Sequence, residues 1–141
     1  MMLNRKKKTG QKPVFLSLYE SSVIEKRIFG KIIIKPRNDI TWLGIKNNGK
    51  VVAYLGYWLH GRNCKVVISG VLPRYRGYGL QKRLIREVLL RVAGESDRIW
   101  AEVEESNSHS LNNFLKLGFS TEIALSNFLI VSRNLKRKKD K

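Results

Sequence analysis

The residues from Arg74 to Ile85, RYRGYGLQKRLI, place two glycines among arginines and tyrosines just before a run with helical spacing. A glycine turn at the start of a helix leaves backbone N–H groups without partners at the positive end of the helix dipole, and such an arrangement binds anions. Gly77 and Gly79 permit close backbone approach, while Arg76 and Lys82 add charges suited to a pyrophosphate. The stretch therefore predicts a phosphate site.

Other interpretations of this stretch each lack something that they require. A dinucleotide-binding glycine motif needs a third glycine where Lys82 stands, and a phosphate loop of the Walker type needs Gly-Lys-Ser/Thr. The letters RGYG begin like the signature of an RNA-recognition motif, whose aromatic residues must continue along a strand to stack bases. Here LQKR follows and opens a helix, so the phosphate site is preferred over a base-stacking strand or a plain turn.

The elements that must position this turn begin with three apolar runs between residues 40 and 71. Asn48-Gly49 separates the first two runs and is typical of a hairpin turn, because both central positions of that turn need positive φ. The letters GRN separate the second run from the third, so we expect three antiparallel strands. Both alternating sets of the middle run are largely apolar, which predicts that other elements cover both faces of that strand.

Helical spacing follows the glycine turn and returns later in the chain. Apolar residues recur at this spacing from Leu80 to Val92, and Gly94 is placed to end the helix. A second helix is expected over residues 108–117, with Gly118 as its stop. The residues expected to face inward from this second helix are Leu111, Phe114 and Leu115.

Alternation of apolar and polar residues predicts three later strands, at residues 98–105, 121–125 and 127–135. The N-terminal pattern is less regular, and we expect a first strand in PVFLSLY (residues 13–19) and a first helix in SSVIEKRIFG (residues 21–30). Together these elements predict a mixed α/β sheet with helices packed on it.

Charge is the most unusual property of the composition. The 141 residues include 28 lysines and arginines against 11 acidic residues, a formal net charge of +17, which favours polyanions and repels cationic substrates. Much of the charge lies in residues 1–12 and 136–141, which we expect to be basic tails around a single domain at residues 13–135. Such tails are usually solvated, and contact with nucleic acid is the alternative.

The sequence also predicts where the protein works. No apolar stretch reaches the roughly 20 residues of a membrane span, and the N-terminus lacks the apolar segment of a signal peptide. We therefore expect a cytoplasmic protein without membrane contact. Cys64 is the single cysteine, so no internal disulfide can form, and we expect it to be a small buried hydrophobe. No metal site is expected.

The glycine turn and a later segment together resemble the GNAT (Gcn5-related) N-acetyltransferases. The pyrophosphate loop of that family is Gln/Arg-x-x-Gly-x-Gly/Ala, and residues 76–81 read RGYGLQ, with Gln81 in place of the last Gly or Ala. We expect the Gln81 side chain to point away along the helix. Residues 100–119, WAEVEESNSHSLNNFLKLGF, resemble the second family motif, in a register closest to the branch that acetylates the N-termini of ribosomal proteins. The resemblance covers residues 68–119.

The resemblance implies a GNAT fold, which is a mixed, mostly antiparallel sheet of about six to seven strands, flanked by helices and splayed between strands four and five. It also implies direct transfer of an acetyl group from acetyl-CoA to an amine. Val71 would donate its backbone N–H to the thioester carbonyl as an oxyanion-type donor. Asn107 would bind the pantetheine arm, with helix capping as the alternative. The implied acetyl-CoA-binding residues are Val71, Arg76, Gly77, Tyr78, Gly79, Leu80, Gln81, Asn107 and Phe114.

The implied reaction needs a neutral amine, whereas a lysine-like amine with a pKa of about 10.4 is mostly protonated near neutral pH. Glu102 is the first choice as general base because its place in WAEV matches the catalytic glutamate of that branch, and Glu104 should share its face of the strand. Either carboxylate could instead be merely solubilising. The acceptor pocket could also be lined by three residues whose other expected role is core or hairpin packing, namely Tyr54, Tyr57 and His60.

Phe114 stands where many relatives carry a tyrosine proposed to protonate the departing CoA thiolate. Phenylalanine cannot donate a proton. A thiol with a pKa of about 8.5 is still a tolerable leaving group, so turnover does not require this acid. Ser110, His109 or water could replace it, although none of them stands at the motif position, and His109 is expected to be an ordinary polar helix residue.

The charge argues against polyamines and histone-like tails as acceptors. It favours an amine on, or beside, something anionic, such as a ribosome-associated protein, a tRNA or DNA base, or a nucleotide-linked sugar. The short turn ALSN, residues 124–127, leaves room for a large substrate. The alternative function is a GNAT-fold binding module associated with nucleic acid and catalytically weak or inactive. Phe114 and the tails favour this module, whereas the intact glycine loop and Asn107 oppose it.

Overall fold

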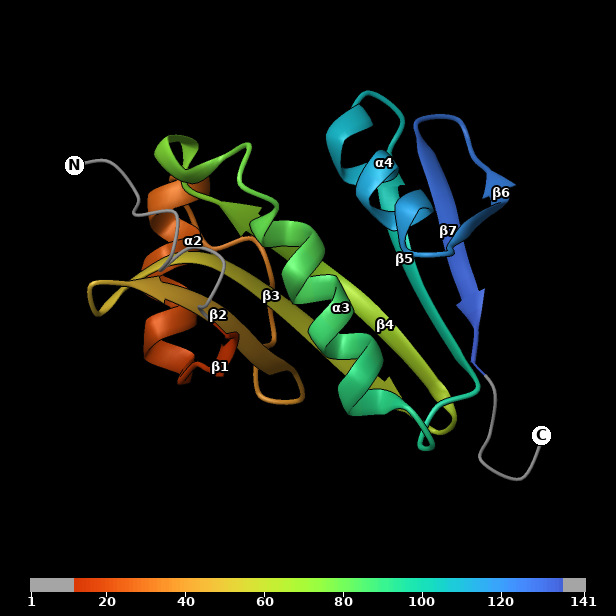
Figure 1. The fold of residues 1–141 in the computed structure, drawn as a ribbon, viewed down its shortest axis with the longest axis horizontal. Coiled ribbons are helices and arrows are strands. Elements are labelled where there is room, and N and C mark those ends of the chain that lie inside the picture. Colours follow the sequence, from red (N-terminus) through yellow and green to blue (C-terminus); the bar gives the residue numbers. More distant parts are fainter. Residues whose placement is uncertain (1–11, 136–141) are drawn as a thin grey trace.

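Three antiparallel strands joined by tight turns form the centre of the sheet, as predicted. The computed structural model describes residues 12–135, and in it β2 (Thr41–Asn47), β3 (Lys50–His60) and β4 (Asn63–Val71) follow one another (Figure 1). Asn48 has φ 54° and Gly49 has φ 79°. Both central positions of the first turn are therefore left-handed, as the hairpin requires.

The sheet has seven strands in the order β1-β2-β3-β4-β5-β7-β6. Neighbouring strands are antiparallel except for β4 and β5, which are parallel. The predicted fold class, a mixed and mostly antiparallel sheet flanked by helices, is confirmed. The remaining strands are β1 (Val14–Phe15), β5 (Arg98–Glu104), β6 (Ser120–Ala124) and β7 (Phe128–Asn134).

The predicted splay between the fourth and fifth strands of the fold is also present. The parallel ladder ends at the pair Val66 and Ala101, although β4 continues to Val71 and β5 continues to Glu104. Beyond the last pair the two strands diverge, and the part of the sheet that carries β5 to β7 turns away from β4 (Figure 1). Backbone groups on the facing edges are thereby released from the ladder.

Helices cover both faces of the central strands. Helix α3 (Leu80–Val92) packs on one face, where Leu55 of β3 joins the larger core, and α2 (Leu18–Phe29) packs on the other, where Tyr54 joins a smaller core (Figure 1). Because Tyr54 and Leu55 are neighbours on one strand and point to opposite faces, the predicted two-sided burial of β3 is confirmed. Helix α4 (Ser108–Lys116) follows β5, and a short 3-10 turn (Pro73–Tyr75) follows β4.

The N-terminal helix begins earlier than the hydrophobic pattern predicted. We expected a strand through residue 19 and a helix from residue 21, whereas β1 has only two residues and α2 starts at Leu18. The reason is a capping box, in which the Glu20 backbone N–H donates to Ser17 Oγ and the Ser17 backbone N–H donates to Glu20 Oε1, each at 3.0 Å. The letters SLYE carry this signal.

The inward face of α4 is also narrower than predicted. Leu115 was expected to face inward but is 41% exposed, whereas Phe114 is buried and Leu111 is half-buried. The buried stripe passes through Ser110, Phe114 and the half-buried Leu117, which is the i, i+4, i+7 spacing of one helix face. Leu115 lies about 100° round the helix from Phe114, which places it outside the buried stripe.

The basic tails predicted at residues 1–12 and 136–141 lie outside the described residues, except for Lys12, which is exposed. Within the described part of the chain, no helix is both long and apolar enough to span a membrane. The same residues contain no cluster of His, Cys, Asp and Glu that could hold a metal ion. Cys64 is free and buried, as predicted.

Candidate active site

The predicted phosphate turn leads into α3 with its backbone facing open space. Gly77 has φ 85° and Gly79 has φ 76°, values that favour glycine. Apart from each glycine and its two chain neighbours, no atom of residues 12–135 lies within 4 Å of the position that a Cβ would take there. Gly79 is the N-cap of α3, and no side chain in the described part of the chain caps the helix. The first N–H groups of a helix need partners, so this geometry fits an anion such as the pyrophosphate of coenzyme A.

The end of β4 presents its backbone toward the splay. Leu72 N–H donates to the Val52 carbonyl at 2.9 Å, and Val71 lies opposite Ala53 in the register. Because hydrogen-bonded and non-hydrogen-bonded pairs alternate in an antiparallel ladder, the N–H and C=O of Val71 point away from β3 and toward the β5 side. Arg76 Nε donates to the Val71 carbonyl at 3.2 Å. The Val71 N–H is thus directed toward the splay.

Gln81 does not point away along the helix, as the sequence led us to expect. Its Nε2 donates to Ser69 Oγ at 2.7 Å and to Ser110 Oγ at 3.0 Å. Its Oε1 accepts from Asn113 Nδ2 at 2.7 Å. The expectation failed because α4 offers polar partners across the splay, and a sequence pattern within α3 cannot reveal them. Ser69 and Asn113 were not predicted as site residues.

Asn107 has the capping role that was the alternative to cofactor binding. Its Oδ1 accepts from the Ser110 backbone N–H at 3.2 Å, and its own backbone N–H donates to the Glu104 carbonyl at 2.9 Å. The residue is exposed and starts α4 immediately after β5. Capping occupies the side-chain oxygen, whereas the rest of the exposed side chain stays accessible to solvent.

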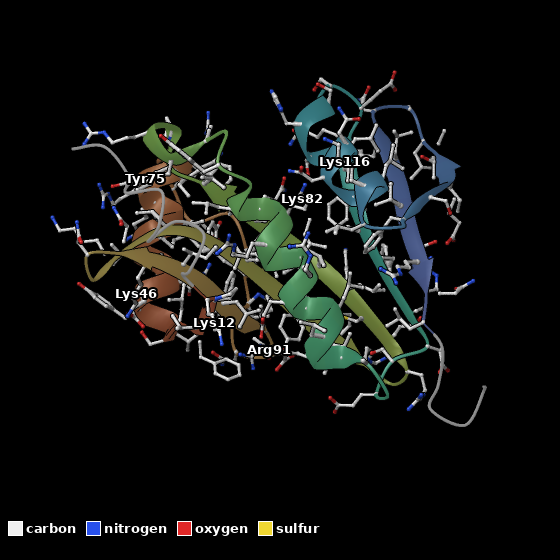
Figure 2. All side chains as sticks on the ribbon, in the orientation of Figure 1. Lys12, Lys46, Tyr75, Lys82, Arg91 and Lys116 are labelled. Carbon is white, nitrogen blue, oxygen red and sulfur yellow. The ribbon has the colours of Figure 1, made fainter. Side chains whose placement is uncertain are left out.

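Other residues of the predicted loop are split between backbone and packing roles. Leu80 is 2% exposed, so only its backbone can reach a ligand. Tyr78 is half-buried against the larger core. Lys82 of α3 and Lys116 of α4 lie on the two helices that flank the splay (Figure 2). Phe114 is 3% exposed and packs edge-on against Phe119, with ring centroids 4.9 Å apart.

Glu102 and Glu104 share the face of β5 that is turned away from α3 and α4. Their neighbours Ala101 and Val103 are buried in the larger core, which fixes this orientation. Glu102 follows the last paired residue of the parallel ladder, and its Oε1 lies 3.1 Å from Lys65 Nζ in a pair open to solvent. The carboxylate therefore stands where β4 and β5 begin to separate.

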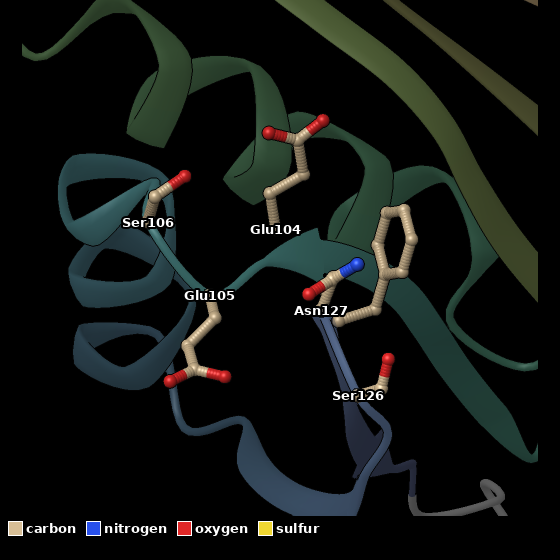
Figure 3. Close-up of a pocket in the computed structure, with 6 residues that line it drawn as sticks. Glu104, Glu105, Ser106, Ser126 and Asn127 are labelled. Atoms are coloured by element: carbon tan, nitrogen blue, oxygen red, sulfur yellow. The ribbon is translucent and has the colours of Figure 1, made fainter.

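A hollow of about 650 Å³ opens beside the end of β5 and was not predicted (Figure 3). The hollow is lined by the end of β5 and by the turn between β6 and β7. Among residues 12–135 no cation forms an ion pair with Glu104 or Glu105. The sequence predicted the strand end and the turn, but it did not predict that both would line one hollow. The lining residues are Glu104, Glu105, Ser106, Ser126, Asn127 and Phe128.

The aromatic residues of β3 pack in the core and hairpin rather than line this hollow. Tyr54 is fully buried and donates to Glu25 Oε1 at 2.7 Å. Burial is the main cause that raises the pKa of its phenol, and the hydrogen bond to the Glu25 carboxylate is the second. Tyr57 is 5% exposed, and burial raises the pKa of its phenol as well. His60 stacks on Trp58 with centroids 4.9 Å apart. His109 is an exposed residue of α4.

Comparisons with known proteins agree with the fold. A sequence model described as the Acetyltransferase (GNAT) family matches residues 11–119. The N-alpha-acetyltransferase RimI of Mycobacterium tuberculosis is 30% identical over 95 residues, which are 64% of this chain and 58% of that relative, so the match spans less than two thirds of the relative's length.

Two solved structures show the same fold at low identity. The ribosomal-protein-S18-alanine N-acetyltransferase of Escherichia coli has a TM-score of 0.70 at 18% identity, covering 89% of this chain and 94% of that one. Arabidopsis thaliana Naa50, in complex with the bisubstrate analogue CoA-Ac-MVNAL, has a TM-score of 0.74 at 17% identity, covering 89% and 99%.

Proposed function

Because the chain belongs to the Acetyltransferase (GNAT) family, we propose that it transfers the acetyl group of acetyl-CoA directly to an amine. The observation that carries the proposal is the uncapped N-terminus of α3, where Gly77 and Gly79 face open space beside the diverging ends of β4 and β5. An anionic cofactor fits this turn, and the gap between the strands suits the arm that leads to its thioester.

The residues of the site have distinct roles in binding acetyl-CoA. Backbone N–H groups of the turn and the start of α3, together with Arg76, hold the pyrophosphate. Asn107 keeps its capping bond and offers its amide to the pantetheine arm. Acetyl-CoA, when bound, supplies an activated acetyl thioester. The Val71 N–H donates to the thioester carbonyl oxygen and stabilises the negative charge that develops there.

Proton removal falls to Glu102, directly or through a water molecule. The carboxylate lies 3.1 Å from Lys65 Nζ, and taking the proton of the attacking amine generates the nucleophile. Phe114 offers no proton, so the thiolate leaves as such or takes a proton from water, which its pKa of about 8.5 permits.

Substitution of Glu102 by glutamine tests this role. We expect kcat to fall by about 10²- to 10⁴-fold with little change in acetyl-CoA affinity. Glu122→Gln is the matched control, since Glu122 also forms an exposed ion pair, at 2.7 Å with Arg98, but stands on β6. Full activity of Glu102→Gln would remove it as the base.

The acceptor class is proposed from charge and from the open hollow. The carboxylates of Glu104 and Glu105 attract a protonated amine, and the net charge of +17 draws the protein toward anionic assemblies. We therefore propose an amine carried on a macromolecule that is itself near nucleic acid, with cytoplasmic ribosomal proteins as the first acceptors to test. The relative RimI is by its name an N-alpha-acetyltransferase, which makes a protein N-terminus the first amine to offer.

The deciding experiment is an acceptor screen that measures CoA release with ribosomes, ribosomal proteins, tRNA, DNA and small amines side by side. Thermal protection by acetyl-CoA is measured in parallel. Gly79→Trp should abolish this protection, whereas Gly61→Trp, another position with positive φ and open space, should retain it. Absence of both protection and CoA release in the wild-type protein would refute the proposal. The alternative, an inactive nucleic-acid-binding module, is not favoured, because the cofactor turn is open.

A further inference from the structure

Gln81 connects the two halves of the molecule at the point where the sheet comes apart. Its carboxamide bonds to Ser69 on β4 and to Ser110 and Asn113 on α4, while Gln81 itself belongs to the first turn of α3. Helix α4 is joined in sequence to β5, and the ladder between β4 and β5 has already ended. The carboxamide thus ties together elements that the sheet no longer holds.

The carboxamide of Gln81 bonds to both sides of the splay, to Ser69 on the β4 side and to Ser110 and Asn113 on the α4 side. A glutamine amide has two N–H donors and one carbonyl oxygen. Both serine hydroxyls accept from Nε2, and Asn113 donates to Oε1, at distances between 2.7 and 3.0 Å. The partners are part-buried, where such bonds are stronger than in bulk water and reinforce one another. A glycine or alanine at this position could make none of these bonds.

We propose that Gln81 is a positioning residue that fixes α4 relative to α3 and β4, so that the passage for the pantetheine arm is formed before acetyl-CoA binds. This inference rests on the proposed function and concerns the same site. A cofactor that enters a formed passage does not have to order α4 itself, and avoiding that ordering strengthens binding. Gln81 acts through Ser110 and Asn113 and need not touch the reacting atoms.

Two substitutions break the network without changing helix preference greatly. Gln81→Met keeps an unbranched side chain of similar length and similar helix propensity but removes every hydrogen bond. Asn113→Ala removes the bond to Gln81 Oε1. Asn112→Ala is the matched control, because Asn112 is an exposed neighbour of the same residue type on α4.

The first measurement needs no cofactor. Amide hydrogen exchange of α4 in the ligand-free protein should become faster in Gln81→Met and Asn113→Ala, because local opening costs less without the network, and should stay at the wild-type rate in Asn112→Ala. Unchanged exchange in both network variants would overturn the proposal, whatever reaction the protein catalyses.

The second measurement separates positioning from a general structural role. The Kd of CoA should rise by about three- to tenfold in both network variants, the range expected from the net loss of a neutral hydrogen bond. The Kd of 3′-phosphoadenosine 5′-diphosphate, which has the nucleotide and pyrophosphate but no pantetheine, should not rise. The double variant Gln81→Met with Asn113→Ala should bind CoA no more weakly than Gln81→Met alone, since the two residues share one hydrogen-bond network.

Each remaining outcome has a definite meaning. Equal weakening for both compounds would show a structural effect and overturn the positioning role, and tighter CoA binding by the variants would show that the network obstructs the arm. If the wild-type protein bound neither compound, the proposed function would be wrong and the role of Gln81 in binding would fall with it. Normal CoA binding by all variants would overturn the positioning role alone.

Discussion

Glu25 anchors the segment that follows α2, and its removal should be the most damaging single change of charge in the described part of the chain. Its side chain is fully buried. It accepts from the Tyr54 hydroxyl at 2.7 Å, from the backbone N–H groups of Ile33 and Ile34 at 2.7 and 3.2 Å, and from Arg37 Nη1 at 2.9 Å. Ile34 of this segment packs against the smaller core, as does Leu72, which follows the last residue of β4.

The perturbation is Glu25→Gln, which keeps the shape but removes the charge and replaces one acceptor oxygen with a donor. The new NH2 group can take the place of Oε1, where the Tyr54 hydroxyl can accept from it, so the remaining oxygen keeps the three donors at the Oε2 position. Arg37 then lacks its counter-charge in a largely buried site. Breaking a buried pair on one side costs about 3–5 kcal/mol. For a chain of this size that loss corresponds to a Tm lower by about 10–20 °C. Free energies of unfolding for domains are about 5–15 kcal/mol, so the change removes a large fraction of stability.

The assay is urea unfolding followed by circular dichroism, with Glu87→Gln as the control. Glu87 also pairs with an arginine, Arg91, at 2.8 Å, but at i, i+4 on a helix surface and with 24% of its side chain exposed. Its loss should be below about 0.5 kcal/mol. If Glu25→Gln fails to fold, Tyr54→Phe removes one bond to the carboxylate and should cost about 1.5–3 kcal/mol. Equal, small losses in the buried and surface variants would refute the reasoning.

Two further predictions concern ionisable groups outside the proposed chemistry. Burial raises the pKa of Cys64 to about 12, so alkylation at pH 8 should be slow in the folded protein and fast in urea, and rapid labelling of the native protein would contradict this. The hydrogen bond from the Ser17 backbone N–H is the main cause that lowers the pKa of Glu20, and the bond from Lys46 is the second. Its carboxylate therefore adds stability above the unfolded-state pKa of about 4.3 and loses that contribution as pH falls through the lower folded-state value. Glu20→Gln should be less stable than wild type at pH 7 and equal to it near pH 2, and a difference that persists at pH 2 would exclude this cause.

Features set by neighbouring residues were predictable from the sequence. The Asn48-Gly49 hairpin depends on the φ preferences of two adjacent residues, and the glycine turn before α3 depends on a few consecutive ones. The predicted start of α2 was too late, because hydrophobic periodicity does not mark the first turn of a helix, whereas the capping pair Ser17 and Glu20 does. Leu115 was misplaced for a related reason, since periodicity cannot tell how wide a face the neighbouring elements cover.

Features set by contacts across the splay were not predictable. The direction of Gln81 depends on Ser110 and Asn113, which lie 29 and 32 residues further along the chain. The hollow depends on the end of β5 meeting the turn between β6 and β7. A single sequence gives the spacing of residues within each element, but it does not give the separation of two elements that no ladder joins.

The net charge and the hollow act on a substrate at different ranges. A net charge of +17 governs the approach of large anionic partners, whereas solvent at physiological ionic strength screens exposed charges beyond about 8 Å. At the shorter range the proposed acceptor amine would meet Glu104 and Glu105, which have no cationic partner among the described residues. The net positive charge would repel a free polyamine on its approach, and Glu104 and Glu105 would attract it only after it had reached the hollow. An amine attached to an assembly that contains nucleic acid is attracted at both stages, and this combination favours a macromolecular acceptor over a small cationic one.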